Sequence, residues 1–309
     1  MRRVSTGWVL LLIAYLIFAP GLFVLAPLAG LLLVSRPASL GEWGWLAGAL
    51  IGCAVWLADL SGVAAQFVRA SGVLLAGAVV CLAGVRRLRT ALALAAVGTA
   101  AAALMALFWC AALGIGWRAV ELAVAHDLWA FFGDQARAAA AMPGPMGAQG
   151  RQLFDQLADE ARDLAMLFPA GLVLSGLGGV ALAWSGYHRI AREPLGVPPG
   201  RFATFTFSDH VIWVVVIGLA LCLAPVPEAL GAVGANLLLT AGVLYLIRGA
   251  AVLRAGAGSL PRPVAAALLL AAIFLLVFVL GGLLLLGLAD TWLHFRRRST
   301  TPSTGGIHR

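Results

Sequence analysis

Long apolar runs, separated by short polar turns, follow one another along almost the whole chain. A run of about 20 apolar residues is long enough for a helix to cross the hydrocarbon core of a bilayer. The pattern therefore predicts an all-α fold, a polytopic transmembrane helical bundle with about eight spans, or between about seven and nine. The predicted spans cover 8–34, 43–58, 63–85, 91–117, 165–187, 211–225, 230–247 and 264–289.

The first apolar run is interrupted by Pro20-Gly21 and again by Pro27. Proline removes a backbone donor and clashes with the preceding turn of a helix. The run is therefore either one kinked span or two short helices folded at Pro20-Gly21. If the arginines at Arg2-Arg3 and at Arg36 face the same side of the membrane, it must be a helical hairpin.

Residues 118–163 differ from the rest of the chain. They are mixed in polarity, repeat apolar residues at helical spacing, and are interrupted at Pro143-Gly144-Pro145. We expect two amphipathic helices that lie outside the bilayer or along its surface. The expected organisation is one transmembrane domain over 1–298, with 118–163 as an extramembrane insertion. A disordered tail over 299–309 is expected because it is rich in Ser, Thr, Pro and Gly.

Composition explains why lipid is the expected solvent. Hydrophobic residues make up 62% of the chain and charged residues only 11%, whereas soluble domains carry about 25% charged residues. The net charge is +8, and all the basic residues that produce it are arginines, since the chain has no lysine. These arginines lie in small groups at the ends of apolar runs. That placement is typical of topology determinants. We expect the lipid bilayer, and no nucleic acid, as a partner.

The same arginines predict an orientation in the cell (inner) membrane. Segments 86–89, 188–201 and 248–262 are basic and are expected to be cytoplasmic. Segment 118–163 holds seven acidic residues and four arginines, a net of −3, and is expected to be non-cytoplasmic. The last span then starts on the cytoplasmic side, which would place Arg296 to Arg298 on the non-cytoplasmic side, against the rule that arginines are cytoplasmic. The conflict disappears if the span 264–289 is re-entrant or is a hairpin bent at Gly281-Gly282.

Ionisable side chains at membrane depth are the first candidates for a site, because each costs about 2.5–3.5 kcal/mol to insert. Arg69 lies inside a predicted span, Gln66 is close to it on the same helix, and Asp59 occupies the preceding turn. These three residues form a candidate ligand-binding group; the alternative is a snorkelling arginine or a structural ion pair. Asn236 near the start of a later span is a further candidate, although such an amide more often bonds a neighbouring helix.

Small residues recur at Gly171, Ser175 and Gly179, every four positions of one span. This spacing lets helix backbones approach closely. We expect it to serve packing within the monomer rather than dimerisation.

Patterns that mark catalysis are missing from the sequence. Without lysine there is no Walker motif, and neither a His-Glu-x-x-His nor a Gly-x-Ser-x-Gly pattern occurs. The four cysteines lie far apart inside apolar runs, without metal or redox spacing. We therefore expect no enzymatic activity, no catalytic residues, no metal site and no cofactor.

Short motifs in the C-terminal half carry a resemblance over roughly residues 160–298. In chain order they are Phe168-Pro169-Ala170-Gly171-Leu172, Tyr187-His188-Arg189, Phe205-Thr206-Phe207-Ser208, Asn236, Leu244-Tyr245, Gly249 and Leu286-Gly287-Leu288-Ala289-Asp290-Thr291-Trp292. This order resembles the YybS-like family of predicted bacterial membrane proteins, whose function is unknown. Members of that family are distantly similar to the substrate-binding S components of energy-coupling-factor vitamin transporters. This chain departs from the family in having Ser208-Asp209-His210 where a Trp and a Pro usually precede the span.

Two functions of different classes follow. The resemblance and the broken first run favour a small-molecule-binding or transport subunit, since interrupted helices often flank transporter sites. Such a subunit would take its energy from partner membrane subunits or an ion gradient. The amphipathic segment 118–163 and the small-residue stripe favour the alternative, a non-transporting scaffold that organises partner membrane proteins.

Overall fold

The structure is a computed structural model that describes residues 6–58, 62–84, 91–140, 145–256, 274–293 and 295. Within these ranges every regular element is a helix, so the predicted all-α class is confirmed. The contacts divide the chain into two compact units, residues 1–199 and 200–309, each described here by itself. The single domain expected over 1–298 stays a prediction, and the tail 299–309 lies outside the described residues.

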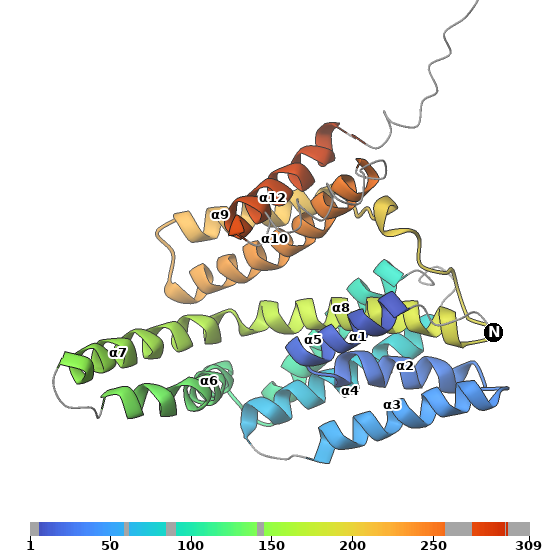
Figure 1. Ribbon diagram of the computed structural model, residues 1–309, viewed down its shortest axis with the longest axis horizontal. Coiled ribbons are helices and arrows are strands. Elements are labelled where there is room, and N and C mark those ends of the chain that lie inside the picture. Colours follow the sequence, from blue (N-terminus) through green and yellow to red (C-terminus); the bar gives the residue numbers. More distant parts are fainter. Residues whose placement is uncertain are drawn as a thin grey trace, which may run out of the picture. The chain divides into compact units, whose positions relative to one another are not determined.

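The first unit contains eight described helices, shown in blue to yellow-green in Figure 1. They are α1 (Thr6–Phe18), α2 (Leu22–Val34), α3 (Leu40–Ala58), α4 (Val63–Ala83), α5 (Ala91–Ala112), α6 (Trp117–Ala140), α7 (Pro145–Met166) and α8 (Phe168–Ile190). Its core lies between α1 to α5 and α8, and the largest side chains buried there include Trp8, Leu28, Leu75, Trp184 and Tyr187.

The second unit is built around three described helices that follow two 3₁₀ turns. The turns are η2 (Phe202–Thr204) and η3 (Asp209–Val211), and the helices are α9 (Ile212–Leu223), α10 (Glu228–Gly256) and α12 (Leu276–Leu293). Helix α10 packs against both α9 and α12.

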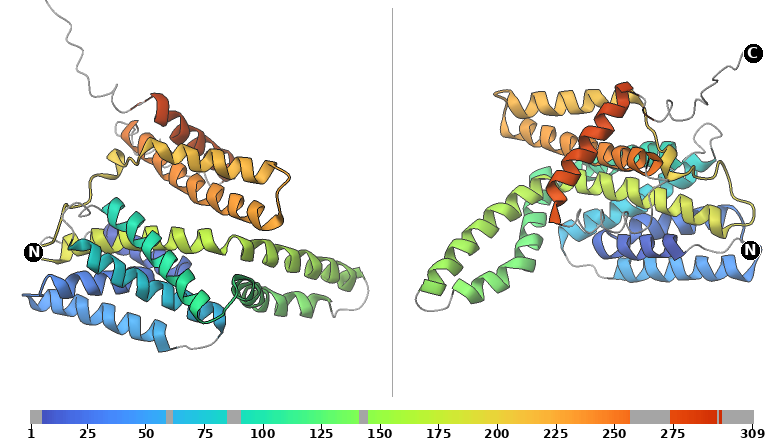
Figure 2. Two further views of the ribbon diagram at one scale, coloured as in Figure 1. Left: turned by 180° about the vertical axis from the view of Figure 1, so that it is seen from behind. Right: turned by 45° about the horizontal axis from the view of Figure 1, so that its top comes forward.

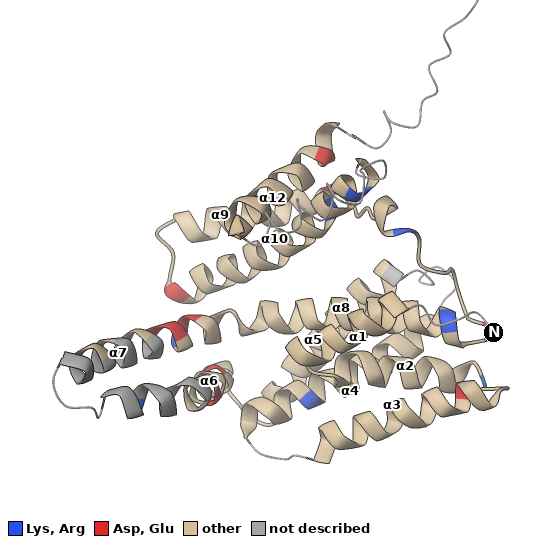
Figure 3. Ribbon diagram, viewed as in Figure 1, with Lys and Arg blue, Asp and Glu red and all other residues tan. Residues whose placement is uncertain are grey.

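Six described helices are long and apolar enough to cross a membrane: Leu40–Ala58, Val63–Ala83, Leu92–Ala112, Phe168–Ile190, Glu228–Gly256 and Leu276–Leu293. Three shorter apolar helices accompany them: Thr6–Phe18, Leu22–Val34 and Asp209–Leu223. Figure 3 shows that uncharged residues make up most of the described ribbon of these helices. The fold is therefore a polytopic helical bundle whose exposed side chains meet lipid, as the composition predicts.

The first apolar run forms two short helices separated at Pro20-Gly21, which is one of the two arrangements the prolines allow. Helix α1 lies against α8, where Trp8 Nε1 donates to Leu182 O at 3.2 Å and Tyr15 Oη donates to Ser175 O at 2.6 Å. Since the sequence number rises along α1 as it falls along α8, the two helices are antiparallel.

Helix α2 returns in the opposite direction to α1. It runs parallel to α4, because Leu22 contacts Gly72 and Gly30 contacts Val80. Helix α4 in turn runs parallel to α8, because Phe67 contacts Phe168 and Leu75 contacts Gly176. The segment 6–34 is therefore a helical hairpin. The two ends of this hairpin, Thr6 and Val34, therefore point the same way, while Arg2 and Arg3 lie outside the described residues.

The small-residue stripe of α8 serves packing within the chain at two of its three positions. A Cβ on Gly179 would lie 2.5 Å from Phe23 O, and Ser175 O accepts the Tyr15 hydroxyl. Nothing lies within 4 Å of the position a Gly171 Cβ would take. Glycine at 179 is thus required by the close approach of the α1–α2 hairpin.

Two predicted span ends are wrong. Helix α5 ends at Ala112 rather than Trp117, because Gly114 adopts a left-handed φ of 68° that terminates a helix. Helix α10 continues to Gly256 rather than ending at Ile247, so Arg248 and Arg254 lie on the helix and not in a loop. The sequence contains no proline between Ile247 and Gly256 that would stop the helix earlier. The predicted last span starts within 257–273, which lie outside the described residues.

The two helices predicted for 118–163 are confirmed as α6 and α7, which lie side by side (Figure 2). Their apolar sides contribute Val120, Val124 and Ala161 to the buried interior of the first unit. Residues 141–144 at their connection lie outside the described residues. The non-cytoplasmic position of this segment stays a prediction.

A buried carboxylate ties the start of α3 to the segment after α8. Glu42 Oε2 accepts hydrogen bonds from the backbone N–H groups of Ala38 and Ser39 and from Ser39 Oγ, at 2.8–2.9 Å. Ser39 Oγ in turn accepts from Glu42 N at 3.3 Å, which completes a capping box. Glu42 Oε1 accepts from Arg192 N at 2.7 Å, 150 residues away in sequence.

Replacing Glu42 with alanine is expected to lower the free energy of unfolding by about 1–3 kcal/mol, because it removes a helix cap and leaves buried N–H donors unpaired. Thermal unfolding of the full chain in detergent measures this. Glu193→Ala, which removes an exposed carboxylate from the same segment, is the matched control. Equal melting temperatures for the two variants would contradict the assigned role of Glu42.

Candidate functional site

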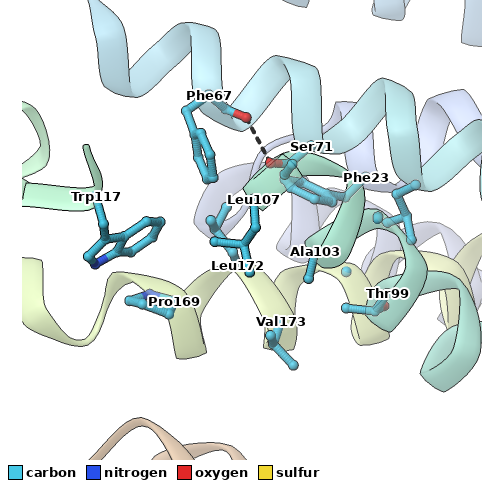
Figure 4. Close-up of a pocket in the computed structure, with 14 residues that line it drawn as sticks. Phe23, Phe67, Ser71, Thr99, Ala103, Leu107, Trp117, Pro169, Leu172 and Val173 are labelled. Atoms are coloured by element: carbon cyan, nitrogen blue, oxygen red, sulfur yellow. Dashed lines mark hydrogen bonds between the residues drawn. The ribbon is translucent and has the colours of Figure 1, made fainter. Parts of the chain in front are cut away.

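The first unit contains an apolar pocket of about 130 Å³ between α4, α5 and α8 (Figure 4). Helix α2 contributes Phe23 and the start of α6 contributes Trp117. The remaining lining residues are Phe67, Ser71, Leu75, Thr99, Ala102, Ala103, Ala106, Leu107, Pro169, Leu172, Val173 and Gly176.

The space exists because the facing side chains of α5 and α8 are small. Ala102, Ala103 and Ala106 lie on the lining side of α5, and Gly176 lies on that of α8. A Cβ on Gly176 would lie 3.0 Å from Thr99 Oγ1, so glycine leaves room for that hydroxyl. On α4, residues four apart share one face of a helix, and Phe67, Ser71 and Leu75 close the opposite wall.

Two hydroxyl groups line this apolar space, and they differ in their bonding. Ser71 Oγ donates to Phe67 O at 2.8 Å, one turn back on its own helix. Thr99 is 8% exposed, and its Oγ1 has no hydrogen-bond partner among the described residues. A buried hydroxyl left unpaired costs about 1–3 kcal/mol. A bound molecule with one hydrogen-bonding group would remove that cost.

Aromatic rings define the end of the pocket toward α6. The Phe67 ring packs edge-on against Trp117, with centroids 5.8 Å apart, and its centroid is 6.2 Å from that of Phe168. Trp117 Nε1 donates to Glu121 Oε1 at 2.6 Å, which fixes the indole. This wall is therefore held in place by a hydrogen bond as well as by packing.

The pocket opens sideways along α5. Ala103 and Leu107 line it and are also exposed, Leu107 with 52% of its surface. Because α5 is a candidate membrane span, its exposed side meets hydrocarbon. The arrangement can admit an apolar molecule directly from the bilayer.

The residues singled out from the sequence lie elsewhere. Gln66 is exposed and Arg69 is half-buried on α4, and neither lines the pocket. The α4 residues that line it are Phe67, Ser71 and Leu75, which share another face of the helix. Asp59 lies outside the described residues. The ligand-binding role of this group stays a prediction.

Asn236 belongs to the second unit. Its Nδ2 donates to Ala232 O at 2.8 Å, one turn back on α10. The amide is therefore bound at least in part by its own helix, and its proposed ligand role also stays a prediction.

The second unit holds a buried ion cluster centred on Arg248 of α10. Arg248 Nε donates to Asp290 Oδ2 at 3.0 Å and Nη2 donates to Asp290 O at 3.2 Å. Arg248 Nη1 donates to Asp209 Oδ1 at 2.9 Å. The Arg248 and Asp290 side chains are 4% and 3% exposed, whereas that of Asp209 is 52% exposed. The cluster thus joins η3, α10 and α12 and reaches the surface only at Asp209.

Aromatic packing surrounds this cluster. The Arg248 guanidinium carbon lies 5.2 Å from the centroid of the Phe207 ring, which packs edge-on against Tyr245. A cation over an aromatic face gains electrostatic stabilisation that is largest where water is excluded. The motifs around Phe207, Tyr245 and Asp290 that carry the family resemblance therefore meet in one place.

Thr99 and the Arg248 cluster were both missed in the sequence. Thr99 is the one hydroxyl residue in the apolar run 91–112, but such a residue usually bonds its own helix and so gives no signal. Arg248 was assigned to a basic loop, and its acidic partners lie 39 and 42 residues away. The rule that a charge inside a span needs a partner would have drawn attention to it.

No group of three or more His, Cys, Asp or Glu suited to a metal ion occurs within the ranges that the structure describes. The absence of metal, cofactor and catalysis expected from the sequence stays a prediction.

Fold and pocket together define a multi-pass helical membrane protein with an intramembrane pocket. The chain belongs to the family described as Predicted membrane protein (DUF2232), which matches residues 8–291. No curated protein and no solved structure matches the chain.

Proposed function

We propose that this protein is a small-molecule-binding or transport subunit of the bacterial cell (inner) membrane, and that the pocket between α4, α5 and α8 is its ligand site. One observation carries the proposal: a space of about 130 Å³ inside the membrane-spanning helices whose buried Thr99 hydroxyl has no partner among the described residues. A well-formed apolar pocket with few convergent polar groups is typical of ligand sites.

The size of the pocket supports a small ligand. An engineered apolar cavity of about 150 Å³ in another protein stays dry and binds benzene. A pocket of about 130 Å³ without charged lining residues is therefore suited to an apolar group of about that size.

The resemblance to the YybS-like family, and through it to transporter S components, supports a role within a larger assembly. With no Walker motif in its sequence, the chain would depend on partner membrane subunits or an ion gradient for energy. We propose no enzymatic activity for it.

A scaffold role is the second candidate, and the α6–α7 pair favours it. Exposed charged residues of α7, namely Asp159, Glu160, Arg162 and Asp163, form a polar surface suited to partner proteins. Stable co-purification of membrane proteins that lack ATPase domains, with no small molecule bound, would favour this role.

A pocket-filling variant tests the ligand site. Ala103→Leu places a larger side chain in the lining, whereas Ala100→Leu puts the same side chain on an exposed position of α5 outside the lining. We expect small molecules that co-purify with the wild-type protein to fall about tenfold in Ala103→Leu, a change of about 1.4 kcal/mol, and to persist in Ala100→Leu. Mass spectrometry of extracts from the purified proteins measures this.

Two outcomes would contradict the proposed function. One is the same set and amount of bound molecules in both variants. The other is wild-type protein without any bound molecule that also fails to gain thermal stability from an extract of its native membranes.

A further inference from the structure

The position and chemistry of Thr99 specify the class of ligand. We infer that the pocket takes an uncharged, bilayer-dissolved molecule with one ring of about benzene size that carries a hydroxyl or carbonyl oxygen, which Thr99 binds. This inference rests on the proposed function and deepens it.

The depth of Thr99 excludes a charged ligand group. Thr99 is eight residues after Ala91 and 13 before Ala112, the ends of α5, or about 12 Å and about 20 Å from them at helical rise. A charge at that depth is costly unless a partner of opposite sign is present. The pocket lining contains no charged residue, so the ligand group beside Thr99 must be neutral.

One polar group on the ligand is enough to give both hydroxyls a hydrogen-bond partner. Ser71 Oγ already donates to Phe67 O, whereas Thr99 Oγ1 has no partner in the described part of the chain. A threonine hydroxyl can both donate and accept. It can therefore bind either a ligand hydroxyl or a ligand carbonyl.

The shape and chemistry of the walls favour a ring. Phe23, Phe67 and Trp117 contribute aromatic surface, and aromatic pairs add about 0.5–1.5 kcal/mol to area burial. A flexible chain of equal volume would lose more conformational freedom on binding. Entry beside Ala103 and Leu107 needs no passage through water, so the ligand is one that dissolves in the bilayer.

Paired photoreactive probes test the inference in the full chain reconstituted in nanodiscs. One probe is a phenyl diazirine with a hydroxyl group on the ring, and the other is the same diazirine without it. We expect the hydroxyl probe to label the lining segments of α4, α5 and α8 about fivefold more, the ratio expected of one hydrogen bond. Peptide mass spectrometry locates the labels.

Three variants make the test specific. Thr99→Val keeps the shape of the side chain and is expected to abolish the preference, so that both probes label equally; Thr99→Ser keeps the hydroxyl and is expected to retain it. Ala103→Leu is expected to reduce labelling by both probes, and Ala100→Leu by neither.

Equal labelling of wild-type protein by the two probes, or a preference that survives Thr99→Val, would overturn the inference. If Thr99→Val fails to fold, the comparison of the two probes on wild-type and Thr99→Ser protein decides. If the two probes label wild-type protein equally and Ala103→Leu still reduces labelling by both, the pocket remains a ligand site and only the role of Thr99 is overturned. Absence of pocket labelling by either probe would overturn both.

Discussion

Replacing Arg248 with methionine is expected to destabilise the unit of residues 200–309 by about 3–5 kcal/mol, the cost of removing one partner of a buried ion pair. The side chain of Asp290 is 3% exposed and would lose its ion pair with Arg248. Asp209 is 52% exposed and would be solvated instead. Hydrogen-exchange mass spectrometry of the full chain in detergent measures the effect as faster exchange in α10 and α12, with α4 and α5 as internal reference.

Two further variants separate the buried pair from a general effect of lost charge. Arg254→Met removes an exposed arginine from the same helix and is expected to leave exchange unchanged. Arg248→Met combined with Asp290→Leu is expected to recover most of the lost stability, because an apolar pair of similar volume often replaces a buried ion pair without cost. Exchange in Arg248→Met equal to that in Arg254→Met would contradict this account.

Alanine at Gly287 is expected to force α10 and α12 apart and to destabilise their contact by about 1–3 kcal/mol, the usual cost of overpacking. A Cβ on Gly287 would overlap Tyr245 O, and one on Gly249 would overlap Leu283 O. Both obstacles are backbone atoms, which cannot rotate away as a flexible side chain can. Thermal unfolding in detergent and exchange of α12 peptides measure the loss.

The same helix supplies the control for this prediction. Gly282 also lies on α12, and nothing lies within 4 Å of the position its Cβ would take. Gly282→Ala is expected to be neutral or slightly stabilising, since alanine is a better helix former than glycine. Similar destabilisation by both substitutions would show that the effect does not come from the close crossing of α10 and α12.

The helical bundle could be predicted from the sequence because apolar run length is a local property of the chain. The break at Pro20-Gly21 was predictable for the same reason, since proline acts on its own turn. The end of α10 could not be predicted in this way. The charge of Arg248 favours a loop, whereas in the structure Asp290 on another helix compensates that charge. Neutralisation by a distant residue leaves no trace in the local pattern.

The pocket was even less predictable. Its lining comes from five helices, and most of it is alanine, leucine and phenylalanine, which also line helix contacts without any cavity. Arg69 is a site candidate in the sequence because a charged residue is rare in an apolar run, yet the pocket lies on another face of the same helix. Whether small side chains on neighbouring helices leave a void depends on how those helices are paired, which periodicity does not specify.

The hairpin of α1 and α2 has a consequence for the bilayer itself. Each arm has 13 residues, a length of about 20 Å, whereas the hydrocarbon core is about 30 Å thick. The bend at Pro20 therefore falls short of the headgroups of the opposite leaflet. The bilayer can accommodate this mismatch if that leaflet thins or bends inward, at a cost of fractions of a kcal/mol per Å. We therefore expect the protein to enrich in the thinner bilayers when vesicles of different lipid acyl-chain length compete for it.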